Sequence, residues 1–176
     1  AVLFIAFLCF SYSLPKKKIS LLVFSKTAGF RHASITEGKT ALLQLARDNN
    51  FSIDTTEDAA WFTAKKLKKY SAVIFLNTTG DVLNDEQQKA FESFIQSGKG
   101  FVGIHAATDT EYGWPWFGKL VGAYFMNHPK TQKAKLVVTD KSNSTVSHLP
   151  EVWERTDEWY NFKNINPDVK VIMTID

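Results

Sequence analysis

The chain alternates between short runs that favour β-strands and longer amphipathic segments that favour helices. The strand-like runs cover residues 19–25, 51–58, 72–79 and 101–107, and the first, third and fourth are largely apolar. Continuous apolar runs of this length are typical of parallel strands that are buried on both faces. The pattern therefore predicts an α/β fold with a doubly wound, mostly parallel sheet.

Three helices are predicted between these strands, at residues 34–50, 59–70 and 84–100. In the first, Ser34 and Glu37 have the spacing of a capping box before an apolar helical face. The third begins after Asn84, a good cap residue, and Gly98 is a natural stop. Strands joined by such helices indicate right-handed parallel βαβ units.

The pattern changes after about residue 123. Residues 134–140 and 169–176 favour strands, whereas residues 148–162 combine a turn, a short helix and an aromatic cluster. Because the sequence ends at Asp176 inside a strand-like run, we expect the domain to be truncated and to continue in a larger protein.

The first 13 residues, AVLFIAFLCFSYS, form an apolar run that is too short to span a membrane. They are similar to the hydrophobic region of a secretory signal, with Ser11 and Ser13 as small residues before a cleavage point. We expect residues 1–13 to be a signal peptide and residues 14–176 to form one secreted or periplasmic domain without stable membrane insertion. A buried N-terminal strand or a membrane anchor is the alternative.

Charge and cysteine content exclude several function classes. The chain has 21 basic and 18 acidic residues, and the basic ones form no stripe that would follow a phosphate backbone, so we expect no nucleic-acid partner. Cys9 is the only cysteine and lies inside the expected signal peptide. The mature domain would therefore have no disulfide, cysteine nucleophile or thiolate metal site.

Polar loops follow three of the predicted strands. In an open parallel sheet the carboxyl ends of the strands meet at one edge, and ligands bind there. Three residues of these loops are predicted to be catalytic: His105, His32 and Asp109. The predicted substrate-binding residues, some from further along the chain, are Arg31, Thr78, Thr79, Asp81, Glu111, Trp116, His128 and Glu158.

Each of these residues also has a structural interpretation. His105 ends a buried strand and would also fit as a core histidine with satisfied hydrogen bonds. Thr78, Thr79 and Asp81 are typical turn residues beside a glycine. Trp116, together with its neighbour Trp114, is more typical of packing than of a platform that stacks on sugar rings.

The chemistry that these groups offer is proton transfer or metal binding. Histidine exchanges protons near neutral pH, and a carboxylate such as Asp109 would orient it. A divalent metal such as zinc is a candidate cofactor, with His105 and His128 as its expected ligands. The sequence contains no HxH or HxxxH pair, so the ligands would have to come from separate loops.

Several long segments resemble one known family. The segments VFSKTAGFRHASI, FLNTTGDVLNDEQQKAFESFI, GKGFVGIHAATDTEYGWPWFGKLVGAYF and DEWYNF are similar to the ThuA-like, or trehalose-utilisation, family. The resemblance runs from about Ile19 to the end of the chain. It implies a flavodoxin-like fold of the class I glutamine amidotransferase type, which agrees with the sheet predicted above.

The resemblance also implies that the chemistry differs from that of the amidotransferases with this fold. Amidotransferases of this fold carry a cysteine nucleophile on the turn after a strand, and His105 occupies the similar position in the segment GIHAA. An imidazole does not readily form the thioester that glutamine hydrolysis uses, so an active amidotransferase is not expected.

Two hypotheses follow from the resemblance and the candidate residues. The first is an exported enzyme that acts on trehalose, another disaccharide or a keto-sugar, by acid–base or metal-assisted chemistry. The second is a non-catalytic carbohydrate-binding or interaction domain. In either case the expected partner is a small carbohydrate, and the resemblance also implies fusion to, or association with, sugar-dehydrogenase modules.

Overall fold

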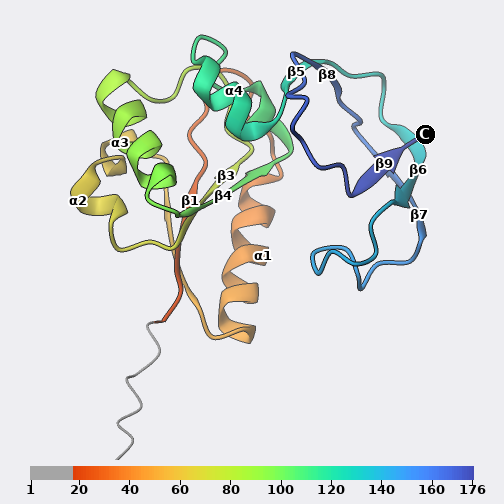
Figure 1. The fold of residues 1–176 in the computed structure, drawn as a ribbon, viewed down its shortest axis with the longest axis horizontal. Coiled ribbons are helices and arrows are strands. Elements are labelled where there is room, and N and C mark those ends of the chain that lie inside the picture. The colour runs from red at the N-terminus through yellow and green to blue at the C-terminus, as the bar shows by residue number, and fades with distance from the viewer. Residues whose placement is uncertain (1–17) are drawn as a thin grey trace, which may run out of the picture.

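A computed structural model describes residues 18–176 and has an α/β fold (Figure 1). Its central sheet consists of β1 (Ser20–Phe24), β2 (Ser52–Thr56), β3 (Ala72–Leu76) and β4 (Gly100–Ile104). The strand order is β2-β1-β3-β4 and every pairing is parallel. This order is the beginning of the flavodoxin-like arrangement, so the predicted doubly wound sheet is confirmed.

Helices cover both faces of this sheet. The helical segments are α1 (Ile35–Asp48), the 3₁₀ turn η1 (Ala59–Trp61), α2 (Ala64–Leu67), α3 (Asp85–Gln96), the 3₁₀ turn η2 (His105–Asp109) and α4 (Pro115–Val121). In Figure 1, α1 lies on one side of the sheet and α2 and α3 lie on the other. The predicted segment 59–70 is therefore helical, as two short pieces.

The core follows from the two-residue period of the strands. Leu22, Phe24 and Phe75 point toward α2, α3 and α4, whereas Val23 and Ile74 point toward α1. The larger of the two core clusters is built mainly from aromatic rings.

Phenylalanine side chains hold that larger cluster together. The ring of Phe75 stacks on the rings of Phe91 and Phe117, each with a centroid separation of 5.4 Å. All three side chains are fully buried. The unusually high phenylalanine content of the sequence is therefore explained in large part by one core face.

Asn84 caps α3 as predicted, and it does so through a capping box with Gln87. The Asn84 side chain accepts a hydrogen bond from the Gln87 amide and the Gln87 side chain accepts one from the Asn84 amide. The predicted box of Ser34 and Glu37 is wrong, because Ser34 already has helical backbone angles and makes no cap bond. Instead, Asn77 Nδ2 donates a hydrogen bond of 2.9 Å to Ser34 Oγ, which ties the start of α1 to the end of β3.

The C-terminal third forms two small antiparallel sheets. Their strands are β5 (Tyr124–Asn127), β6 (Gln132–Val138), β7 (Val152–Asp157), β8 (Asn161–Lys163) and β9 (Met173–Ile175). β5 pairs with β8, and β6 pairs with both β7 and β9. The predicted strands within residues 134–140 and 169–176 are confirmed.

The short helix predicted within residues 148–162 is wrong, since residues 152–157 form β7. Six consecutive residues of β7 pair with β6, from Asp157 opposite Gln132 to Val152 opposite Val137. This pairing with a distant strand outweighs the weak local preference for a helix.

No helix within residues 18–176 is long and apolar enough to cross a membrane. The expected signal peptide, residues 1–13, lies outside the described residues, so its cleavage stays a prediction.

We predict that Phe91→Ala lowers the free energy of unfolding by about 3–5 kcal/mol, because it removes a ring from the centre of the aromatic core. The exposed Phe30, 71% accessible, provides a control, and Phe30→Ala should change stability by no more than about 0.5 kcal/mol. Urea denaturation followed by circular dichroism measures both values. Equal losses in the two variants would contradict this description of the core.

Candidate metal and acid–base site

The candidate site lies at the carboxyl edge of the parallel sheet. His32 lies in the loop after β1, and His105 is the first residue after β4. The backbone of His105 turns sharply there, with a φ of 49°, a left-handed value that is uncommon outside glycine. Such a turn lifts the side chain out of the sheet, as it does for nucleophiles on strand-to-helix turns. Glu158, directly after β7, completes the group.

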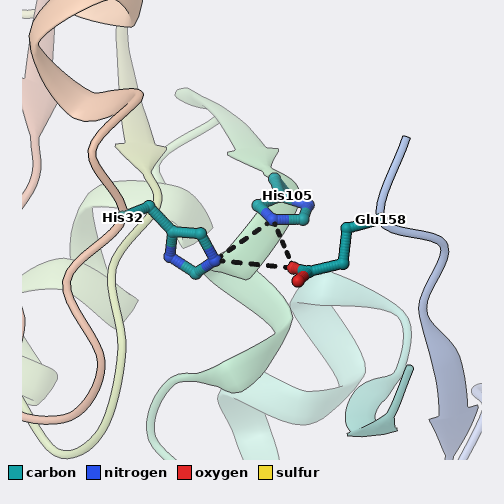
Figure 2. A group of neighbouring side chains, drawn as sticks. All are labelled: His32, His105 and Glu158. Atoms are coloured by element: carbon teal, nitrogen blue, oxygen red, sulfur yellow. Dashed lines mark hydrogen bonds and ion pairs between the residues drawn. The ribbon is translucent and has the colours of Figure 1, made fainter. Parts of the chain in front are cut away.

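His32, His105 and Glu158 point toward one another, and Figure 2 shows them as one group that we name the His/Glu cluster. The two imidazole Nε2 atoms lie 3.2 Å apart. Glu158 Oε2 lies 3.4 Å from Nε2 of His105 and 3.7 Å from Nε2 of His32. Residues from three distant parts of the chain therefore bring three potential ligand atoms within 4.8 Å of one another.

Two further side chains, Tyr160 and His128, contact the cluster. The Tyr160 hydroxyl lies 3.1 Å from Nε2 of His105 and 3.3 Å from Nε2 of His32. His128 Nε2 lies 3.3 Å from Oε1 of Glu158, the carboxylate oxygen that is not aimed at the other two histidines. The Nδ1 atom of His128 lies 2.9 Å from the carbonyl oxygen of Pro129, which only accepts, so Nδ1 carries a proton.

The electrostatics of the cluster favour neutral imidazole at His105. Burial lowers the pKa of His105, and the neighbouring His32 lowers it further, whereas the carboxylates of Glu158 and Asp157 act in the opposite direction. Burial also raises the pKa of Tyr160, with a further contribution from Glu158. At neutral pH the site therefore presents an imidazole lone pair beside a phenol that keeps its proton.

The separations within the cluster fit a small divalent metal. Zinc binds imidazole nitrogen and carboxylate oxygen at about 2.0–2.2 Å, so tetrahedral ligands lie about 3.3–3.5 Å from one another. The three measured separations, 3.2, 3.4 and 3.7 Å, lie close to that range. Two histidines and one glutamate also form a ligand set that is known from catalytic zinc sites, which keep a further position open.

Comparisons with known proteins agree with this fold. A model of the ThuA family, described as trehalose utilisation, matches residues 20–176. The chain belongs to the ThuA family. No curated protein matches the chain.

Solved structures of ThuA-like proteins have the same fold. One from Bacteroides uniformis is 26% identical, with a TM-score of 0.78, over 95% of this chain and 72% of that one. Another, from Parabacteroides merdae, is 19% identical, with a TM-score of 0.76, over 90% of this chain and 68% of that one. A glutamine amidotransferase from Thermotoga maritima, 16% identical with a TM-score of 0.50, shares the fold over 89% of this chain and 66% of its own.

Of the residues predicted for the site of this ThuA family member, His32, His105, His128 and Glu158 meet at the cluster. Asp109 lies in the turn after His105, but its carboxylate accepts a hydrogen bond of 2.6 Å from the Tyr112 hydroxyl.

Two predicted residues lie on the surface outside the cluster. Arg31 forms two hydrogen bonds with Glu57, at 2.9 and 3.0 Å. Asp81 is exposed and lines a separate pocket beside Lys26.

Four other predicted residues are buried or partly buried. Thr78 and Thr79 are fully buried; Thr78 shares a hydrogen bond with Thr110, and Thr79 donates one to the Phe30 carbonyl oxygen. The third is Glu111, described next, and the fourth is Trp116, which packs against the aromatic core.

Glu111 is buried beneath the loop that follows β3. Its Oε1 accepts hydrogen bonds of 2.8 Å from the amides of Val82 and Leu83, and its Oε2 accepts one of 2.6 Å from Gln88. Burial raises the pKa of this carboxyl group, and these hydrogen bonds oppose the shift. Glu111 therefore fixes the path of the loop from inside the protein.

Sequence reasoning missed Tyr160, which belongs to the aromatic cluster noted within residues 148–162. Its hydroxyl contacts both histidines, and its ring lies 4.4 Å from that of His105, measured between centroids. The available signal was its position two residues after Glu158, in a short segment that returns to the sheet edge. That return depends on the pairing of β7 with β6, which the sequence pattern did not predict.

We predict that Glu158→Gln lowers the pKa of His105 further in the metal-free protein, because the variant removes a negative charge that favours the imidazolium form. NMR titration of the His105 ring protons measures the change. Glu154→Gln is the matched control, since Glu154 lies on β7 and pairs with Lys133 instead. An unchanged or raised pKa in Glu158→Gln would contradict the described geometry.

Proposed function

We propose that the chain is an exported enzyme of carbohydrate metabolism whose chemistry on a disaccharide or keto-sugar is assisted by a divalent metal such as zinc. The observation that carries the proposal is the His/Glu cluster, in which two imidazole nitrogens and a carboxylate oxygen converge at the carboxyl edge of the sheet. The family's description as trehalose utilisation supports a sugar as the substrate.

Each residue of the cluster has a role in this proposal. His32 and His105 would hold the ion through their Nε2 atoms, and Glu158 would hold it through Oε2. His128 contacts the other oxygen of Glu158 and keeps the carboxylate in its orientation. A bound zinc ion would polarise a sugar carbonyl or lower the pKa of a bound water.

Tyr160 supplies the hydrogen-bond donor in this proposal. Its hydroxyl is within 3.3 Å of both ligand nitrogens, and its raised pKa keeps it protonated at neutral pH. A donor at this position would stabilise negative charge that develops on a sugar oxygen during proton transfer or hydrolysis.

The packing of Trp114 and Trp116, the two tryptophans considered as a sugar platform, favours an enzyme over a binding domain. Sugar-binding platforms need exposed rings, whereas Trp114 and Trp116 stack on each other and pack against the core around Phe91. The polar groups that can transfer protons or bind a metal instead lie at the His/Glu cluster.

An amidotransferase activity is not part of the proposal. His105 occupies the turn after β4, where the fold family carries its nucleophile, and imidazole is not a substitute for a thiolate in thioester formation. The only cysteine of the sequence, Cys9, lies in the N-terminal apolar run.

The proposal that the protein is exported rests on the sequence of this apolar run, residues 1–13, alone.

We predict that the protein binds one zinc ion per chain and that His105→Ala weakens this binding by more than roughly 100-fold, because a ligand is lost. His148→Ala is the matched control, since His148 is exposed and belongs to no described cluster. Isothermal titration with zinc measures both variants. Wild-type affinity in His105→Ala would place the ion elsewhere and contradict the proposal.

We predict that Tyr160→Phe lowers kcat roughly 100-fold while zinc affinity is retained, because the variant removes one donor near the reacting oxygen and no ligand. Turnover of 3-keto-trehalose, followed by NMR, measures the rate. Tyr70→Phe is the control, since the Tyr70 hydroxyl bonds to Asp54 away from the cluster. An unchanged kcat in Tyr160→Phe would remove this residue from the mechanism.

A further inference from the structure

Two pockets adjoin the His/Glu cluster and share His105 and Asp157. One of about 550 Å³ lies against the start of α1, and we name it the α1 pocket. The other, of about 400 Å³, is lined largely by side chains from the C-terminal strands, and we name it the aromatic pocket. Both volumes lie within the range of small-molecule sites. The separate pocket beside Lys26 shares no residue with either of them.

The α1 pocket combines polar and apolar side chains, and its lining has one more carboxylate than guanidinium groups. Its lining includes Ser34 and Glu37 from the start of α1, and Arg155 and Asp157 from β7. Arg155 forms an ion pair with Asp157, so the guanidinium and the two carboxylates leave no strong excess of positive charge. A lining that offers both donors and acceptors and has an excess of carboxylates suits a neutral ligand with many hydroxyl groups better than an anion.

The aromatic pocket has a different lining. Trp159, Tyr160 and Phe162 contribute rings, and Leu136 and Met173 contribute aliphatic surface. Trp159 is fixed by a hydrogen bond of 2.8 Å from its Nε1 to the Gln132 carbonyl oxygen. An immobilised ring next to acceptors such as Asp157 fits the apolar face and the hydroxyl edge of a sugar ring.

We propose that the cluster lies between two sugar subsites, so that a two-ring sugar spans it. One ring occupies the α1 pocket, the second occupies the aromatic pocket, and the bond between the rings lies over His105. This inference rests on the proposed function and deepens it, because it makes both rings of a disaccharide determinants of specificity. A single sugar ring fills only one pocket and binds more weakly.

Filling the α1 pocket tests the first subsite. Ala41 lines this pocket and is exposed, so Ala41→Phe places a ring in the pocket without removing a polar group. Leu45→Phe is the matched control, since Leu45 is an exposed residue of the same helix outside the pocket. We expect Ala41→Phe to weaken the binding of trehalose to the zinc-loaded protein by roughly tenfold or more, and Leu45→Phe to leave it unchanged.

Trp159→Ala tests the second subsite in the same titration. Trp153→Ala is its control, because Trp153 lies on β7, interacts with the same Arg155 and is not part of the pocket lining. We expect Trp159→Ala to weaken trehalose binding and Trp153→Ala to leave it unchanged. In the wild type, glucose should bind more weakly than trehalose by roughly tenfold or more.

Equal affinities for glucose and trehalose would overturn the two-subsite inference, as would unchanged trehalose binding in Ala41→Phe or in Trp159→Ala, or no binding of either sugar. Zinc titration of the wild type and of each variant distinguishes a failure of the two-subsite inference from a failure of the proposed function. If zinc binds but the sugar results fail, the subsites are wrong and the metal site stands. If zinc does not bind the wild type, the proposed function fails, and sugar titration of the metal-free protein decides the subsites.

Discussion

The convergence of His32 Nε2, His105 Nε2 and Glu158 Oε2 is the interaction on which the proposed chemistry depends. These three atoms can each present a lone pair, and they lie beside one another. Such an arrangement is costly unless a proton or a cation lies among the groups. A divalent metal at the centre of the cluster would accept all three lone pairs at once.

The fold provides this convergence in two steps. The parallel order β2-β1-β3-β4 brings the ends of β1 and β4 to the same edge, which places the loops of His32 and His105 together. The antiparallel pairing of β7 with β6, and of β8 with β5, then returns Glu158 and Tyr160 to that edge. The left-handed backbone of His105 directs its imidazole toward the returning segment. The site is therefore shared between the parallel sheet and the antiparallel C-terminal strands.

The sheet and α3 could be predicted because their signals are local: apolar runs of strand length and the capping pair Asn84 and Gln87. The meeting of His32 with His105 could also be predicted, since parallel topology alone places both at one edge. The direction in which each side chain points could not be predicted from the sequence. Thr78 and Thr79 are at the correct strand end but their hydroxyls are engaged inside the protein. The role of Tyr160 was hidden because β7 is a polar, exposed strand that is recognisable only through its pairing with β6.

The most direct test of the central claim is a crystal structure of the zinc-soaked protein with anomalous diffraction recorded at the zinc absorption edge. We predict a single anomalous peak within about 2.0–2.2 Å of Nε2 of His32, Nε2 of His105 and a carboxylate oxygen of Glu158. A peak coordinated by other residues, or no peak at the cluster at zinc concentrations that saturate the protein, would contradict the account.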